Sequence, residues 1–189
     1  MTGSIEQLQK DFEIDIRWTA FPLRPDTPKQ GWTLEEVFAD RDIDIDQMTD
    51  HLKQVASKFG LPFGERKKTY NSRLAQELGK FAEWKGKADE FHNAVFRAYF
   101  VDGQNIGKAS ILVGLAESIH LNGKDALKVI QDRTYKEAID LDWKRCCELE
   151  VTVAPTFLFN RQRLVGAQNF EILEKLLLSN NVKRRNLKK

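Results

Sequence analysis

The order of the apolar patterns along the chain constrains its fold more than any other feature of the sequence. Residues 12–18 (FEIDIRW) alternate apolar and charged side chains, the two-residue period of a half-buried strand. Residues 31–150 change to apolar spacings of three and four, typical of amphipathic helices. Residues 151–180 predict a hairpin, VTVAPTFLF followed by RLVGA, and then a closing helix. A lone strand is unstable, so we expect residues 12–18 to join the hairpin in one sheet, with the helices inserted into a single α/β domain.

Prolines and capping residues predict where loops and helices lie. Pro22, Pro25 and Pro28 make residues 21–31 (FPLRPDTPKQG) a rigid loop that continues neither helix nor sheet. Residues able to cap a helix start precede the expected helices: Thr33 with Glu36, Asp44 or Asp46, Asn71 or Thr69, Thr134 with Glu137, and Asn169. The helix after Asp44 or Asp46 is expected to pack through one apolar face, formed by Ile45, Met48, Leu52, Val55 and Phe59.

Composition and charge exclude several classes of protein. The 189 residues are 41% hydrophobic and include 12 Phe and 4 Trp, which is enough apolar surface for a folded core. The formal net charge of +2 indicates neither a nucleic-acid partner nor a membrane partner. No run of 18 apolar residues occurs, and the first twenty residues lack a signal-peptide core. We therefore expect a cytoplasmic protein.

Cysteine and histidine give no pattern typical of a metal or cofactor site. The only two cysteines, Cys146 and Cys147, are neighbours within an apparent helix, so they define neither a disulfide framework nor a zinc motif. We interpret them as small, partly buried hydrophobic residues; redox sensing or capture of a soft metal is the alternative. His51, His92 and His120 lie far apart and have no partner at ligand spacing. We expect no bound metal and no cofactor.

Pro155 stands at the entry to an apolar strand, where it cannot donate to a β-ladder. One explanation is a cis peptide bond that exposes the backbone of Ala154 at a sheet edge, where an extended ligand could pair with it. The trans form is the commoner one for X-Pro bonds, and the residues alone leave both open.

Five segments stand in order along nearly the whole chain: FPLRPDTPKQG, TYNSRLAQELGKFAEW, FHNAVFRAYFVDGQNI, VTVAPTFLF and RLVGAQNFEILEKLL. Together they resemble the DsbA-like thioredoxin family, in particular its cytoplasmic FrnE-like branch. The resemblance implies a thioredoxin-like fold with a helical insertion, a cis peptide at Pro155, and thiol–disulfide exchange with protein or small thiols. The family is similar in fold to 2-hydroxychromene-2-carboxylate isomerases and kappa-class glutathione transferases, which use glutathione.

The chain departs from this family at its redox motif. The family begins with a strand and then a C-x-x-C at the start of the first helix, where the helix dipole lowers the pKa of the attacking thiol. The sequence contains no C-x-x-C, and SIEQLQKD resembles the second half of that helix. We therefore expect Met1 to fall just after the motif, with the first strand and the start of the first helix missing. Cys146 and Cys147 match no family redox position, so no catalytic residue is assigned.

The resemblance implies residues that border the family's cleft. Ala154, Pro155 and Thr156 resemble the cis-proline loop, where the backbone of Ala154 would pair with a bound peptide or glutathione. The expected substrate-binding residues are Ala154, Pro155, Thr156, Asn71, Gly166 and Gln168. Structural alternatives exist for three of them: Asn71 as a helix N-cap, Gly166 as a turn residue and Gln168 as a solvated loop residue.

The expected layout has four parts. Residues 1–30 and 151–180 form the thioredoxin-like part, residues 31–150 form the helical insertion, and residues 181–189 are a basic, solvated and frayed tail. Loss of a central strand would leave two unpaired sheet edges, which favours a homodimer or aggregate over a stable monomer.

Three functions follow from these observations. The first is a thiol–disulfide oxidoreductase of protein or peptide substrates that is inactive without the motif. The second is a non-catalytic thioredoxin-like binding module, and the third is a glutathione-dependent, isomerase-like enzyme. Glutathione enters as an alternative substrate and not as a cofactor.

Overall fold

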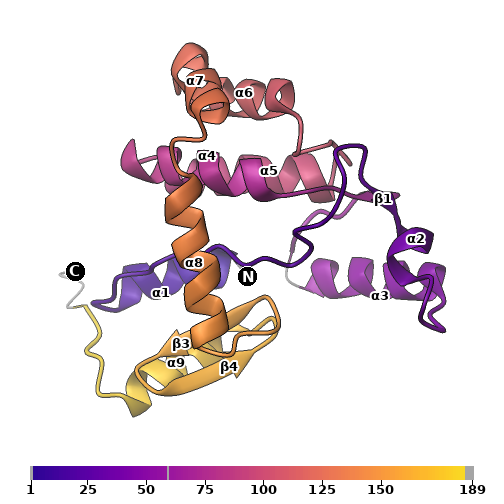
Figure 1. The fold of residues 1–189 in the computed structure, drawn as a ribbon. Coiled ribbons are helices and arrows are strands. Elements are labelled where there is room, and N and C mark those ends of the chain that lie inside the picture. Colours follow the sequence, from indigo (N-terminus) through magenta and orange to yellow (C-terminus); the bar gives the residue numbers. More distant parts are fainter. Residues whose placement is uncertain (1, 59, 186–189) are drawn as a thin grey trace. The chain divides into compact units, whose positions relative to one another are not determined.

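The protein forms two compact units, each described by itself. The structure, a computed structural model, describes residues 2–58 and 60–185 (Figure 1). One unit, here called the terminal unit, combines residues 1–23 with residues 143–189. The other, the inserted unit, comprises residues 24–142. The division falls inside the predicted Pro-rich loop and inside a helix, and the segment limits at residues 30 and 150 stay a prediction.

The terminal unit contains a β-hairpin packed on two helices. Its elements are α1 (Thr2–Asp11), β3 (Thr156–Phe159), β4 (Gln162–Val165) and α9 (Phe170–Ser179), together with the end of α8 (Lys136–Glu148). The strands pair antiparallel, with Phe157 opposite Leu164 and Phe159 opposite Gln162. Asn160, in the turn, has a φ of +55°, a left-handed conformation that Asn tolerates. The predicted hairpin and closing helix are confirmed.

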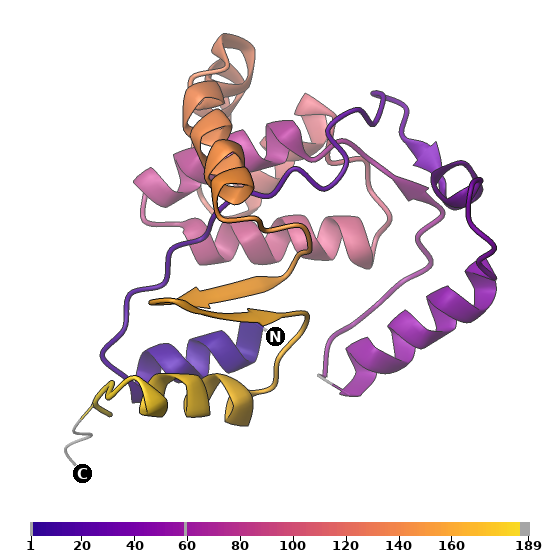
Figure 2. The same ribbon diagram turned by 60° about the horizontal axis from the view of Figure 1, so that its bottom comes forward.

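The core of the terminal unit joins the two ends of the chain. Leu8 and Phe12 are buried with Leu173 and Leu177 of α9. Phe157, Phe159 and Leu164 of the hairpin pack against the same cluster. Figure 2 shows α1 and α9 side by side on one face of the hairpin. Residues separated by most of the sequence therefore share one core.

The prediction that residues 12–18 form a strand is wrong. Phe12 forms a single isolated bridge with Arg184, and residues 13–20 adopt no regular structure. Burial still alternates along this segment as predicted: Ile14, Ile16 and Trp18 are half-buried, and the residues between them are exposed. An extended segment becomes a strand only when a neighbouring strand pairs with it. Among the described residues, this segment has no such neighbour beyond the bridge at Phe12.

The basic tail is docked along its described part. Arg185 donates from its backbone N–H to the carbonyl of Asp11 (2.7 Å) and from Nε to the carbonyl of Phe12 (2.8 Å). The guanidinium of Arg184 lies 5.2 Å from the centroid of the Phe12 ring and pairs with Glu174. The prediction of a frayed tail is therefore wrong for Arg184 and Arg185, which bind the end of α1 and Glu174, although both remain exposed to solvent as predicted. Residues 186–189 lie outside the described residues.

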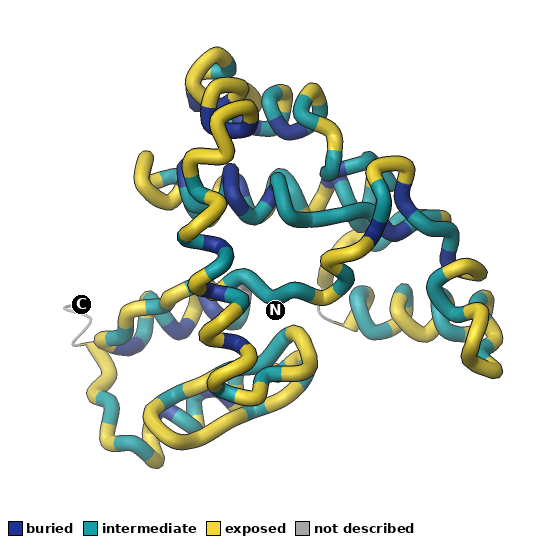
Figure 3. Tube along the Cα trace, in the orientation of Figure 1, coloured by how far each residue is buried: buried dark blue, intermediate teal, exposed yellow. Residues whose placement is uncertain are grey.

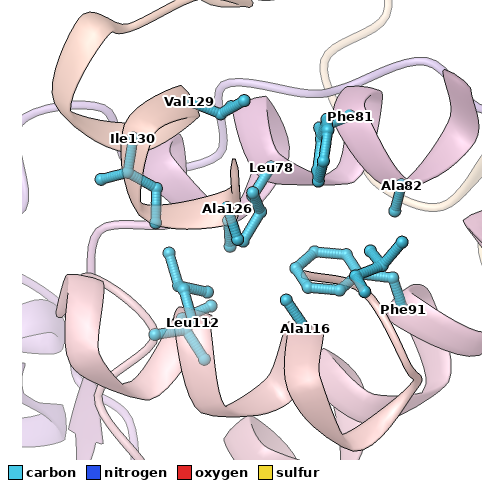
Figure 4. Packing of buried hydrophobic residues seen from close by; sticks show 12 residues of the cluster. Leu78, Phe81, Ala82, Phe91, Leu112, Ala116, Ala126, Val129 and Ile130 are labelled. Carbon is cyan, nitrogen blue, oxygen red and sulfur yellow. The ribbon is translucent and has the colours of Figure 1, made fainter. Parts of the chain in front are cut away.

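The inserted unit is helical around its own core. Its elements are β1 (Trp32–Thr33), α2 (Leu34–Phe38), α3 (Ile45–Lys58), β2 (Lys68–Thr69), α4 (Arg73–Trp84), α5 (Ala88–Phe100), α6 (Ala109–Ser118), α7 (Gly123–Asp132) and the start of α8. Leu78 of α4, Phe91 of α5, Leu112 of α6 and Ala126 of α7 meet in this core (Figure 4). The two-residue ladder between β1 and β2 was not predicted, because pairings this short leave no periodic signal.

Several predicted caps are present. The backbone N–H of Glu36 donates to Thr33 Oγ1 (3.2 Å) while the N–H of Thr33 donates to the Glu36 carboxylate (2.6 Å), a reciprocal capping box. Asp44 accepts from the N–H of Gln47, and Asn169 accepts from that of Ile172. The structure thus selects Asp44 over Asp46, while α8 begins at Lys136, inside the predicted Thr134–Glu137 turn.

The prediction that α3 packs through a buried apolar face is wrong. It begins at Ile45, as predicted, and runs to Lys58, but it buries none of its described residues, and Leu52 remains 38% exposed. Figure 3 shows no fully buried position along α3. Phe59, predicted for its apolar face, lies outside the described residues. An amphipathic pattern predicts a helix; whether its face is covered depends on neighbours that the pattern does not contain.

Two asparagines hold the Pro-rich loop. Asn71 Nδ2 donates to the carbonyls of Pro25 and Thr27, both at 2.9 Å, while its Oδ1 accepts from the N–H of Arg73. Asn105 repeats the arrangement: its Nδ2 donates to the carbonyl of Lys29, and its Oδ1 accepts from the residue two positions on. Neither Asn71 nor Thr69 is the N-cap of α4, since that position is Ser72.

A buried carboxylate ties the helices of the inserted unit together. Glu77 of α4 is 1% exposed and accepts two hydrogen bonds from Arg133 and one from Arg73, at 2.6 to 2.7 Å. Arg73 also pairs with Asp140 on α8. Burial alone would raise the pKa of Glu77, but the hydrogen bonds and charges of Arg133 and Arg73 outweigh it and hold the pKa below its ordinary value.

Replacement of Glu77 by Gln should destabilise the protein. The change leaves two arginines facing a neutral amide, and breaking a buried ion pair costs about 3 to 5 kcal/mol. Arg133 is 42% exposed, so water relieves part of this loss and we expect about 2 to 3 kcal/mol. Glu90→Gln, in an exposed pair with Lys87, is the matched control and should leave the unfolding midpoint almost unchanged, because solvent screens the pair. Urea unfolding of both variants measures the difference; equal midpoints would contradict it.

Replacement of Asn71 by Asp should release the Pro-rich loop. The carboxylate keeps the acceptor for Arg73 but loses both donated hydrogen bonds, each contributing about 0.5 to 1.5 kcal/mol. Limited proteolysis should then cut residues 21–31 faster. Asn122→Asp is the control, because Asn122 only accepts hydrogen bonds, from Lys124 and Asp125, and Asp serves equally there. Cleavage at the same rate in both variants would show that Asn71 does not hold the loop.

Candidate functional site

The entry to β3 is the centre of the predicted site. The peptide bond between Ala154 and Pro155 is cis, the isomer that the family resemblance implies. Ala154 is exposed, whereas Pro155 and Thr156 are half-buried. The Thr156 hydroxyl donates to the carbonyl of Val153 at 2.5 Å. The Thr156 side chain therefore holds the turn that leads into β3, and Ala154 within this turn is exposed.

The end of β4 lies beside this entry. The N–H of Gly166 donates to the carbonyl of Pro155 at 2.8 Å, which brings the two predicted segments together. Gly166 has a φ of +86°, a left-handed conformation that only glycine adopts without strain. Gln168 Nε2 donates to the carbonyls of Val165 (2.8 Å) and Gly166 (3.4 Å). Five of the six predicted substrate-binding residues thus gather at one end of the hairpin.

Asn71, the sixth, belongs to the inserted unit. Its amide is fully engaged by the Pro-rich loop and by Arg73. Asn105, which holds the same loop, was missed by the sequence reasoning. Asparagine favours Asx turns, in which its side chain accepts from the N–H two residues on, and both Asn71 and Asn105 form one. This tendency of asparagine is the signal that could have pointed to Asn105.

The cysteine pair lies near the end of α8, outside the two strands of the hairpin. Neither cysteine is part of a disulfide; Cys146 is buried and Cys147 is exposed. Cys146 Sγ lies 3.5 Å from the carbonyl of Ala20, which a thiol can reach as a weak donor. The interpretation of Cys146 as a small buried hydrophobic residue agrees with this placement.

The histidines stay apart in the structure. His51 and His120 are exposed, while the His92 ring stacks on Phe96 with centroids 4.2 Å apart. Burial lowers the pKa of His92, and the charge of Asp89 opposes this only in part. Within the described ranges, no three His, Cys, Asp or Glu side chains are arranged to hold a metal ion. Every helix there is also too short or too polar to span a bilayer.

Comparison with known proteins agrees with this architecture. A model of the DSBA-like thioredoxin domain matches residues 1–178. The chain is 27% identical over 187 residues to the uncharacterized protein YwbO of Bacillus subtilis, covering 93% of this chain and 86% of that relative.

Solved structures share the fold. A probable DsbA oxidoreductase of Streptomyces coelicolor is 22% identical with a TM-score of 0.76, over 88% of this chain and 75% of its own. A 2-hydroxychromene-2-carboxylate isomerase is 17% identical with a TM-score of 0.62, over 80% and 70% of the two chains. The predicted fold class, a DsbA-like thioredoxin fold with a helical insertion, is confirmed. The chain belongs to the DsbA-like thioredoxin domain family.

Proposed function

We propose that this protein acts in thiol–disulfide exchange, as a cytoplasmic member of the FrnE-like branch, and that these 189 residues hold the substrate without carrying the dithiol. The observation that carries the proposal is the gathering of Ala154, Pro155 and Thr156 with Gly166 and Gln168 at one end of the hairpin, in a chain that the family model matches over residues 1–178.

The substrate is an extended segment of a protein or peptide that contains a cysteine. Ala154 is exposed at the start of β3, and its backbone groups can pair with such a segment as an added strand. Gly166 has no side chain to obstruct this end of the hairpin, and a Cβ placed there would meet no atom within 4 Å. Glutathione, a short peptide with one thiol, is the alternative substrate.

The redox step needs groups that these residues do not provide. Exchange requires a thiolate that attacks the substrate disulfide and, in a dithiol cycle, a second thiol that resolves the mixed disulfide. Cys146 and Cys147 are adjacent on α8, and Cys146 is buried. A pair so placed lacks the helix N-terminus that would stabilise a thiolate. We therefore assign no catalytic residue.

Two other functions use the same surface. A non-catalytic binding module would hold an extended partner at Ala154 and never exchange disulfides. A glutathione-dependent isomerase-like enzyme is the third candidate; the isomerase among the solved structures is 17% identical to this chain, which supports the fold and not the activity. Binding and turnover must therefore be measured separately.

The 189 residues should not reduce insulin with dithiothreitol at a rate above the uncatalysed one, because no low-pKa thiolate is encoded at a helix N-terminus. A C-x-x-C thioredoxin is the positive control, and the double variant Cys146→Ser, Cys147→Ser should match the unmodified chain. Turnover comparable to the thioredoxin, lost in that double variant, would overturn the assignment.

An unstructured cysteine-containing peptide should bind at the end of the hairpin. In nitrogen-15 NMR spectra, titration should move the backbone amide signals of Ala154, Thr156 and Gly166, while those of Lys124 and Asp125 in the inserted unit stay in place. A control peptide with proline at alternate positions cannot donate along the strand and should bind more weakly. Reduced glutathione, titrated in parallel, distinguishes a peptide site from a glutathione site. Saturable shifts confined to other residues would contradict the proposed site.

A further inference from the structure

The apolar face of α3 is not covered within a single chain. None of the described residues of this helix is buried, and no other helix or strand of the described chain packs along it. Leu52, in the middle of the face, is 38% exposed. Removing apolar surface from water is favourable, so a partner that covers this face would be stabilised by it.

The spacing of the apolar residues fits one partner helix. Four of them recur at intervals of three, four and three, the spacing of the a and d positions of a heptad: Ile45, Met48, Leu52 and Val55. This spacing gives a narrow seam that packs against a single helix, whereas a helix facing a broad core has a wider apolar face. Thr49 and Ala56 border the seam on one side, and their small side chains let a second helix approach.

The charges along α3 divide by sign. Acidic residues lie at its start and basic residues in its second half: Asp44, Asp46 and Asp50, then Lys53 and Lys58. Two parallel copies of α3 would place like charges beside each other. Antiparallel copies instead place the acidic start of each helix beside the basic end of the other, and they also align opposite ends of the helix dipoles.

Two of these charges are available for a partner. Asp44 accepts a hydrogen bond from the N–H of Gln47 through Oδ1, and among the described residues neither Asp44 nor Lys58 forms an ion pair. Both occupy the g position of the heptad, on the same side of the seam. In an antiparallel pair of helices, this side of one helix faces the same side of the other.

We propose that a second copy of this chain covers the face by packing its own α3 antiparallel to the first. A two-fold axis near Asp50 places Ile45 opposite Val55 of the other copy, and Met48 opposite Leu52. Asp44 of each copy then lies beside Lys58 of the other, which gives two ion pairs across the interface. The surface is complementary to itself, as a two-fold dimer requires. The face belongs to the inserted unit and not to the hairpin, so this proposal does not depend on the proposed function.

Sedimentation equilibrium of the 189-residue chain tests the proposal. The interface is small, so the weight-average mass should rise toward twice that of one chain only at high protein concentration. Leu52→Gln removes two apolar side chains from the dimer core and should weaken dimerisation by about tenfold or more. Leu127→Gln is the matched control, because Leu127 is 39% exposed on α7 of the same unit. This control should leave dimerisation unchanged.

The orientation of the helices is tested by charge. Lys58→Glu places like charges together twice in the antiparallel dimer and should weaken it about threefold to tenfold at low salt. Adding Asp44→Asn removes this repulsion while keeping the N-cap of α3, since Asn caps as well as Asp, and should recover most of the loss. Sodium chloride at about 1 M should abolish the difference between the two variants, because salt screens exposed charges.

Circular dichroism on heating should give the same melting temperature for all variants as for the unmodified chain, because α3 contributes no buried residue. Should Leu52→Gln fail to fold, the charge variants and their salt dependence decide alone. A chain that stays monomeric up to about 1 mM would overturn the proposal, even if a synthetic Leu/Lys amphipathic helix binds α3 instead. A dimer that Leu52→Gln weakens no more than Leu127→Gln, or that Lys58→Glu leaves intact, would also overturn it.

Discussion

The packing of Leu8 and Phe12 against Leu173 and Leu177 is the contact on which the terminal unit depends. Phe12 is completely buried, and its neighbours in the core come from the other end of the chain. The entropic cost of closing a loop grows only slowly with loop length, so a long insertion between the two halves of this unit is tolerated. The inserted unit satisfies this condition because it has a core of its own, centred on Leu78 and Leu112.

Charged and polar groups add hydrogen bonds and ion pairs between the segments that the apolar cores bring together. Arg184 and Arg185 close the end of α1 by binding the backbone of Asp11 and Phe12 and the carboxylate of Glu174. In the inserted unit, Glu77 has the equivalent role, since its buried carboxylate holds both Arg73 and Arg133. Of these groups only Glu77 is a buried charge, so its arrangement is the one sensitive to the loss of a partner, whereas Arg184 is 57% exposed and its ion pair contributes less.

The open end of the hairpin carries the proposed function. Ala154 lies just before β3, and the N–H of Gly166 donates to the carbonyl of Pro155, so the two segments of the proposed substrate site are held together. The Gln168 side chain donates to the Val165 carbonyl at the end of β4, so it supports the hairpin whether or not it contacts a substrate. The family resemblance indicated this end of the hairpin as the site, and the hydrogen bonds show which of its side chains have a structural role.

Local chemistry let the sequence by itself determine much of this protein. The capping box at Thr33 and Glu36, the cap at Asn169, the hairpin and the family all depend on residues close together in the chain or on motif order, and all were predicted correctly. Only the tertiary structure decided whether residues 13–18 become a strand, whether the face of α3 is covered, and which carbonyls Asn71 binds. The reason is physical: a ladder, a buried face or a long-range hydrogen bond needs a partner remote in sequence, and no periodicity within a segment reports whether that partner is present.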